Sequence, residues 1–277
     1  IKQTIKEGKT TKDRKQEYLA SFTVLDSTEN SYLISWKYEN DLENTFKLPK
    51  ELTDKFSKYK FTEIKYKTSE LGEFQEIINW KEVSKIMLQM VNDIIETLAK
   101  DEESKKVIKK AMNAFKKIYS SKQGIEQLVV KELQYFHFPM GYEFETNKKL
   151  EYDDELPNMF GGEPLKAKGS VIFESVNEED GFCVVKQTLD VDSEDTKAML
   201  KSVFIKMGFK DEKLIEALKT GNISIKDKNT YEYYYNPGIP HKIETVRETN
   251  LNLMNEKGRN FEKIIIELQY NEDESEE

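Results

Sequence analysis

The spacing of apolar residues changes period along this chain, and this change constrains the fold more than any single motif does. Segments with a period of 2, typical of strands, fill residues 17–78. Residues 79–138 follow a period of 3.6, and strand-like segments return from residue 142. Because strands and helices do not alternate regularly, a doubly wound parallel sheet is disfavoured. The pattern predicts an α+β fold with a curved, mainly antiparallel sheet made of hairpins and helices packed on one face.

Two hairpins are expected in the first β region. The segments EYLASFTVL and NSYLISWKY alternate apolar and polar residues on either side of the polar turn DSTEN. The segments FTEIKYKT and FQEII flank the turn SELGE, in which Gly72 is the turn residue. We therefore expect four strands before the helical block.

The helical block is expected to open with a long amphipathic helix. Asn79 and Glu82 have the spacing of a capping box, and the helix should extend to about Lys100. Its apolar side includes Met87 and Met90. Such methionines fill cores, but they also suit adaptable hydrophobic ligands.

Two further helices complete the expected block. One should span Glu102–Tyr119, and the other should follow Ser121 and end at Pro139 and Gly141. Their apolar residues recur at helical spacing, so each helix should bury one side.

The second β region is expected to contain more hairpins and two short helices. GYEFETNKKLEY resembles a hairpin, Tyr152–Pro164 resembles a loop, and SVIFESV and FCVVKQTLDV should pair across NEEDG. The remaining expected elements are helices at 193–207 and 212–219, and strands at 223–225, 230–235, 242–251 and 261–270. We expect one domain over residues 1–277, with a β region (17–78), a helical block (79–138), a second β/α region (142–270) and mobile ends (1–16 and 271–277).

Charge and motif content argue against several classes of function. The net charge is −9, and a basic cluster occurs only near the start of the chain, so nucleic acid is not an expected partner. No Gly-rich phosphate loop occurs, and the two histidines, His137 and His241, lie outside any zinc or triad motif. The single cysteine, Cys183, reads as a buried thiol on a strand. We expect no catalytic residue, metal or cofactor.

Two acidic segments have an open interpretation. Asp190–Asp195 begins like a calcium loop, but Asp195 stands where glycine is needed, so Asp192 or Ser193 is expected to cap the next helix. The cluster Asp153, Asp154 and Glu155 could hold a cation or serve a hydrolase, or it could belong to a solvated loop.

An aromatic segment, TYEYYYNPGIPHKIET, is the strongest candidate for a ligand site. Tyr231, Tyr233 and Tyr235 alternate and therefore share one face of a strand. That face could be core beneath the helices, or it could line a hydrophobic pocket together with Met87 and Met90. Asn236-Pro237-Gly238 reads as the turn that ends the strand.

Two segments carry a resemblance to known proteins. KTSELGEFQEIINWKEV and the later YYYNPGIPHKIETVRET resemble segments of uncharacterised secreted or lipid-anchored proteins of Bacteroidetes. The plan of a curved sheet with helices is similar to that of periplasmic lipoprotein carriers of the LolA kind. The resemblance implies a bacterial protein of the periplasm or cell surface, with no catalytic residues carried over.

From these observations we expect a non-enzymatic envelope protein that binds a lipid or acyl chain between sheet and helices. An envelope interaction or scaffold domain with a packed core is the alternative, and a carboxylate-dependent hydrolase is a further one. No run approaches the roughly 18 apolar residues of a membrane helix. The chain begins at Ile1 and not at methionine, so a lipid anchor on a preceding segment remains compatible with it.

Overall fold

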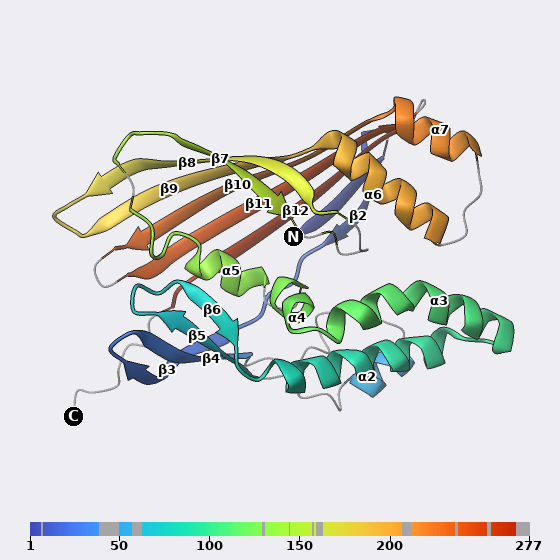
Figure 1. The fold of residues 1–277 in the computed structure, drawn as a ribbon, viewed down its shortest axis with the longest axis horizontal. Coiled ribbons are helices and arrows are strands. Elements are labelled where there is room, and N and C mark those ends of the chain that lie inside the picture. The colour runs from blue at the N-terminus through green and yellow to red at the C-terminus, as the bar shows by residue number, and fades with distance from the viewer. Residues whose placement is uncertain are drawn as a thin grey trace.

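A computed structural model describes residues 1–6, 8–38, 50–56, 63–128, 131–143, 145–156, 158, 163–206, 212–235, 238–253 and 256–269. It contains two antiparallel sheets with helices between and beside them (Figure 1). This confirms the α+β class and the antiparallel hairpins. The strands are divided between two sheets, one large and one small.

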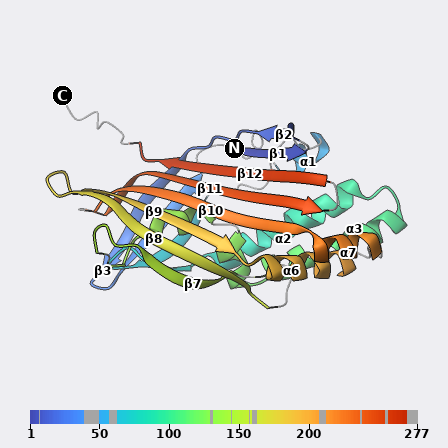
Figure 2. The ribbon, with the colours of Figure 1, turned by 90° about the horizontal axis from the view of Figure 1, so that it is seen from above.

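The large sheet has eight strands, and its order brings the start of the chain beside the end of the chain. In order across the sheet, they are β2 (Lys9–Arg14), β1 (Lys2–Lys6), β12 (Glu256–Glu267), β11 (Ile239–Leu253), β10 (Asn222–Tyr234), β9 (Phe182–Val191), β8 (Leu165–Asn177) and β7 (Leu150–Leu156). Figure 2 shows these strands side by side, with α2 and α3 beneath them. We call the side that faces the helices the inner face and the opposite side the outer face.

The small sheet has four strands in chain order, as the two early hairpins predict. They are β3 (Ala20–Thr28), β4 (Ser31–Tyr38), β5 (Glu63–Ser69) and β6 (Phe74–Ile77). Gly72 forms the β5–β6 turn with a φ of 85°, a conformation that glycine adopts without a steric penalty.

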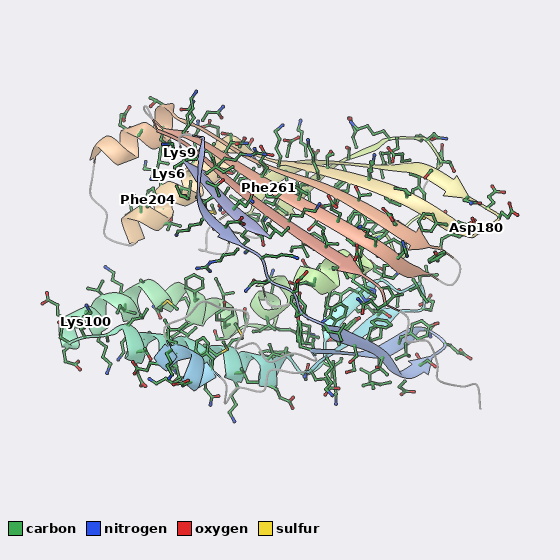
Figure 3. The ribbon with its side chains drawn as sticks, turned by 180° about the vertical axis from the view of Figure 1, so that it is seen from behind. Lys6, Lys9, Lys100, Asp180, Phe204 and Phe261 are labelled. Atoms are coloured by element: carbon green, nitrogen blue, oxygen red, sulfur yellow. The ribbon has the colours of Figure 1, made fainter. Side chains whose placement is uncertain are left out.

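Seven helices accompany the sheets in the described residues. They are α1 (Lys50–Phe56), α2 (Trp80–Leu98), α3 (Glu102–Tyr119), α4 (Lys122–Leu128), α5 (Lys131–His137), α6 (Ser193–Lys206) and α7 (Glu212–Thr220). The short helix α5 lies between the two sheets, and α6 and α7 lie at one end of the large sheet (Figure 1). Lys100, in the α2–α3 turn, and Asp180, in the β8–β9 turn, lie at opposite ends of the long axis (Figure 3).

One hydrophobic core joins both sheets through α5. Ile64 and Tyr66 from β5 are fully buried in the same cluster as Tyr231 from β10 and Ile243 from β11. Leu133 of α5 is fully buried between these layers. Because α5 presents apolar residues to both sheets, it holds the two sheets in one core.

The α2 helix begins where the sequence predicts, but Asn79 does not cap it with its side chain. Its Oδ1 accepts from the backbone N–H of Lys65, 2.9 Å away, and its Nδ2 donates to the carbonyl oxygen of Glu63 at 3.1 Å. The predicted capping box with Glu82 is therefore wrong. Asn79 instead binds the backbone of β5, which fixes the start of α2 against the small sheet.

The expected hairpin from Tyr142 and the expected loop from Tyr152 are both wrong in part. The described residues between 142 and 149 form no strand, and Asn147 has a φ of 60° in a turn. Residues 150–156 form strand β7, with Tyr152 and Asp154 on its half-buried side. The acidic residues resemble a loop in sequence, yet an edge strand tolerates them on its exposed side.

Other boundaries differ in smaller ways. Within the end expected to be mobile, residues 1–16, the structure has the paired strands β1 and β2, and β1 also pairs with β12. The strands expected at 223–225 and 230–235 belong to the single strand β10. Where a third helix of the block was expected, the described residues contain α4 and α5. The expected mobile tail, residues 271–277, lies outside the described residues.

Candidate functional site

The tyrosines expected to line a pocket are divided between core and surface. Tyr231 is 0% exposed and Tyr233 is 3% exposed, whereas Tyr235 lies beyond the end of β10 and is 45% exposed. Tyr231 stacks against Phe138, with ring centroids 5.0 Å apart. Since Tyr231 and Tyr233 belong to the core cluster, their shared face is packed. Tyr235 is not brought together with them.

Each buried tyrosine has a partner for its hydroxyl group. The Tyr231 hydroxyl donates to Oε1 of Gln187 at 3.0 Å, and the Tyr233 hydroxyl donates to the carbonyl oxygen of Phe136 on α5. Burial raises the pKa of both tyrosines well above the usual value. Both groups are therefore neutral hydrogen-bond donors. Tyr231 links β10 to β9 within the large sheet, and Tyr233 joins this sheet to α5.

The two methionines expected at the site lie on α2, in the helical block. Met87 is half-buried and packs against the core cluster, and Met90 is also half-buried. Their role as core filler is consistent with this placement.

A polar cluster on the inner face was not expected from the sequence. Gln187 of β9 is buried, and its Nε2 donates to the hydroxyl of Tyr152 at 2.7 Å. Its Oε1 accepts from Nδ2 of Asn229 at 2.8 Å, in addition to Tyr231. The four residues come from β7, β9 and β10, so only the strand order brings them together. In the sequence, only the alternation of residues along each strand indicated that these side chains share a face.

A partly buried ion pair lies next to this cluster. Arg247 of β11 donates from Nε to Oδ1 of Asp227 at 2.7 Å and from Nη2 to Oδ2 at 2.6 Å. Asp227 is buried, and the bond to its carboxylate raises the pKa of Arg247. The bidentate geometry leaves neither group available as a general acid or base.

The two histidines have structural surroundings. His137 is buried at the end of α5, with Nε2 2.9 Å from the Tyr66 hydroxyl and Nδ1 2.7 Å from the carbonyl oxygen of Gly72. Burial lowers the pKa of His137 to about 4. His241 is exposed and packs its ring edge against Tyr234, with centroids 5.8 Å apart. No carboxylate contacts either ring in the described residues.

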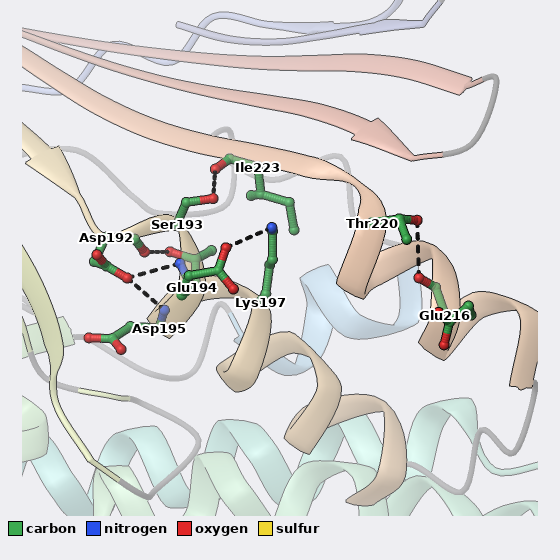
Figure 4. Close-up of polar contacts among 9 residues, drawn as sticks. Asp192, Ser193, Glu194, Asp195, Lys197, Glu216, Thr220 and Ile223 are labelled. Carbon is green, nitrogen blue, oxygen red and sulfur yellow. Dashed lines mark hydrogen bonds and ion pairs between the residues drawn. The ribbon is translucent and has the colours of Figure 1, made fainter.

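The acidic segment Asp190–Asp195 caps a helix, as one interpretation predicts. Oδ1 of Asp192 accepts from the backbone N–H groups of Glu194 and Asp195, each at 2.9 Å (Figure 4). The Ser193 hydroxyl donates to the carbonyl oxygen of Ile223 at 2.7 Å and ties α6 to β10. In the described parts of the chain, no group of three or more His, Cys, Asp or Glu side chains could hold a metal ion.

The cluster of Asp153, Asp154 and Glu155 lies on the edge strand β7. Asp153 and Glu155 are exposed and stand opposite Lys168 and Lys166 of β8. Asp154 points to the other face, so the three carboxylates do not converge. This arrangement gives the hydrolase hypothesis no support.

The edge strand β3 and the residues before it expose several large apolar side chains. Phe22, Val24 and Leu25, with Tyr18 and Leu19 before the strand, are between 38% and 50% exposed. Among the described strands, β3 pairs with β4 alone. Phe22 also contacts Phe136 of α5, with ring centroids 5.1 Å apart. A patch of large apolar side chains therefore lies along an edge that can still accept a strand.

The three other sheet edges are protected. The edge strand β2 has the sequence KTTKDR and is exposed throughout, and β7 carries acids on its outer side. At β6, the backbone N–H of Ile77 donates to Oε1 of Glu126 from α4 at 2.9 Å. Charge or a side-chain bond thus disfavours pairing at each of these edges, whereas Phe22, Val24 and Leu25 place uncharged, partly exposed side chains along β3.

Comparison of this chain with protein-family models, curated proteins and solved structures found no match. In the part of the chain that the structure describes, no helix combines the length and apolar character that crossing a membrane would require.

Proposed function

We propose that this protein is a non-enzymatic interaction module that binds an extended segment of a partner protein along β3. One contrast carries the proposal. The edge strand β3 pairs only with β4 among the described strands and exposes apolar side chains, whereas the three other edges are protected. Natural sheets usually protect an exposed edge, so an apolar edge indicates a surface that another chain covers.

The geometry of strand addition explains the residue types on β3. The backbone of an added strand would supply hydrogen bonds that are independent of the partner's sequence. Phe22 and Val24 stand opposite Trp36 and Ile34 and therefore face the core side, where a partner's alternate side chains could extend the apolar layer. The packed face at Tyr231 and Tyr233 supports a module with a filled core.

A photoreactive residue placed at Thr23, on the exposed strand, tests the proposal in producing cells. We expect one major crosslinked partner, and slower amide exchange over residues 20–26 in the purified complex. The substitution Val24→Lys should abolish the crosslink, because a lysine on an edge blocks strand pairing. The matched controls are a photoreactive residue at Ile205, an exposed position on α6, and the substitution Ile205→Lys.

Equal crosslinking from both positions, or an unchanged crosslink in Val24→Lys, would contradict the proposal. A crosslinked species of twice the chain mass would identify the partner as a second copy of this chain. As a defined probe, an array of extended peptides with alternating apolar residues should bind the wild-type chain and fail to bind Val24→Lys.

We also propose a location in the bacterial cell envelope, periplasmic or surface-exposed, with attachment by a lipid on a preceding segment. The resemblance of KTSELGEFQEIINWKEV and YYYNPGIPHKIETVRET to secreted or lipid-anchored proteins supports it. Fractionation of the producing cell tests it, since recovery in the cytosol alone would contradict it.

A carrier of a lipid or acyl chain is a second candidate function, favoured by a different observation. The helix α3 has no buried residue among those described, and Val107 is 65% exposed and Phe115 36% exposed. Both residues lie on the apolar stripe of α3, which could contact a hydrophobic ligand. Native mass spectrometry after gentle purification, with a fluorescent fatty acid as a probe, should then show bound lipid. Absence of both signals would exclude the carrier.

A further inference from the structure

A groove on the outer face of the large sheet has a different chemistry from the β3 edge. It has a volume of about 220 Å³ and lies where β10, β11 and β12 approach the turn between β1 and β2. Figure 2 looks onto this face, and no described helix crosses it. The groove is open and smaller than the pockets of roughly 300–1,000 Å³ that hold drug-sized ligands. Its size suits one small ring.

The strand register arranges the polar side chains of the groove in two rows. Ser224, Asn250 and Arg259 stand side by side in one row across β10, β11 and β12. The next row contains Asn222, Asn252 and Lys257 on the same three strands. Alternate residues of a strand share a face, so all six point to the outer side.

These residue types match a sugar. A side-chain amide both donates and accepts hydrogen bonds, as a sugar hydroxyl does, and three amides here lie beside one hydroxyl, that of Ser224. Ile5 extends the Arg259 row onto β1 and supplies an apolar wall for the C–H groups of a ring. The described lining residues thus combine polar groups on one face of the sheet with a small apolar surface.

The charge of the groove selects among sugars. Lys257 and Arg259 are cationic, and none of the described lining residues is acidic. Glu248 lies outside both rows, on β11 two residues before Asn250. It binds Nη2 of Arg259 at 2.9 Å and accepts from Nδ2 of Asn250 at 3.2 Å. This carboxylate orients both side chains, and Lys257 at the rim supplies the charge for an anion.

We propose that this groove binds a sugar that carries a carboxylate or phosphate group. Ser224 and the three asparagines would bind the ring hydroxyls, and Lys257 would bind the anionic group, beside Arg259 whose charge Glu248 offsets. The proposal is independent of the function proposed for β3, which lies in the other sheet.

Titration of the full chain with D-glucuronate and with glucose 6-phosphate, followed by NMR of the asparagine side-chain amides, tests the site. We expect saturable shifts with a Kd of about 1 mM for at least one of them, in keeping with a small open site. Glucose, acetate and inorganic phosphate should each bind at least about tenfold more weakly. The Kd values of D-glucuronate and glucose 6-phosphate show whether the site prefers a carboxylate or a phosphate group.

Substitutions separate the two parts of the site. Lys257→Gln should weaken binding of the acidic sugar about tenfold without changing that of glucose, whereas Asn252→Leu should weaken both. The matched control is Lys263→Gln, on the same strand and face but outside the groove, which should leave binding unchanged. Thermal melting of each variant reports folding.

Three results would overturn the proposal. The first is the absence of saturable shifts with either acidic sugar. The second is equal affinity for inorganic phosphate and glucose 6-phosphate, which would indicate a simple anion site. The third is unchanged binding in folded Lys257→Gln and Asn252→Leu.

Discussion

The Tyr66 hydroxyl on β5 lies 2.9 Å from Nε2 of His137, the last residue of α5. The Gly72 carbonyl oxygen can only accept, so Nδ1 of His137 carries the proton and Nε2 accepts from Tyr66. Both contacts are satisfied by the neutral ring. The buried, neutral histidine therefore joins α5 to the small sheet through both ring nitrogens.

The stability of the protein should fall as the pH is lowered from about 6.5 to about 4. Burial lowers the pKa of His137 from 6.5 to about 4 in the folded protein, whereas the unfolded chain binds the proton near 6.5. Above pH 6.5 both states are neutral at this residue, so the effect is absent there. Over the full window the free energy of unfolding should decrease by about 3 kcal/mol because of this residue.

Urea unfolding at several pH values measures this effect. His137→Gln should be less stable at pH 7.5, because packing and a hydrogen bond are lost, but its stability should depend less on pH between 6.5 and 4. His241→Gln, at the exposed histidine, is the control and should retain the wild-type dependence. An equal slope in His137→Gln and wild type would disprove the assignment.

Removal of the Tyr233 hydroxyl should destabilise the fold. Tyr233→Phe leaves the carbonyl oxygen of Phe136 buried without this partner, at a cost of about 1–3 kcal/mol. Tyr235→Phe, at an exposed position, should change stability by less than about 0.5 kcal/mol. Chemical denaturation of both variants provides the comparison. Similar values for the two would show that the buried bond contributes nothing.

The ion pair made by the buried carboxylate of Asp227 should matter far more than the exposed pairs. Asp227→Asn weakens two charge-assisted bonds to Arg247 and should cost about 1.5–3 kcal/mol. The exposed pair of Lys242 with Glu267 should tolerate Lys242→Gln with little change. Unfolding at low and high salt distinguishes them. A large loss in both variants, or in neither, would contradict this ranking.

The edge strand β7 should depend on the absence of a side chain at Gly169. A Cβ there would lie 2.2 Å from the ring of Tyr152, which stands opposite on β7. Gly169→Ala should displace this ring, break its bond to Gln187 and cost about 1–3 kcal/mol. Amide exchange over residues 150–156 should accelerate. In Gly169→Ala/Tyr152→Ala the clash is removed, so the added alanine should cost less than it does beside Tyr152.

The sequence predicted correctly those elements whose defining residues lie close together in the chain. The helix at Glu102–Tyr119 and the hairpin across NEEDG match the structure because caps and turn residues lie within the segments. Strand β7 was missed, since its acidic residues are acceptable only at an edge, and the edge is set by β8. Asn79 was assigned a local cap, yet its partners are on β5. Distant partners explain each error.

The candidate sites divide in the same way. Alternation placed Tyr231 and Tyr233 on one face of a strand. Whether that face is packed depends on where α5 lies relative to the sheet, and no local sequence pattern specifies that position. The apolar composition of β3 was visible in the sequence, whereas its position at an edge was not. The outer groove requires the register of three strands and was not predicted at all.

The pairing of β1 with β12 also bears on how the chain acquires its structure. The backbone nitrogen of Ile1 donates to the carbonyl oxygen of Lys263 at 2.8 Å, across 262 positions of sequence. During synthesis the β1–β2 hairpin leaves the ribosome long before β12 exists, whereas the strands of the small sheet pair only with one another, within residues 20–77. The large sheet is therefore completed last, and until then the β1 edge is open to other chains.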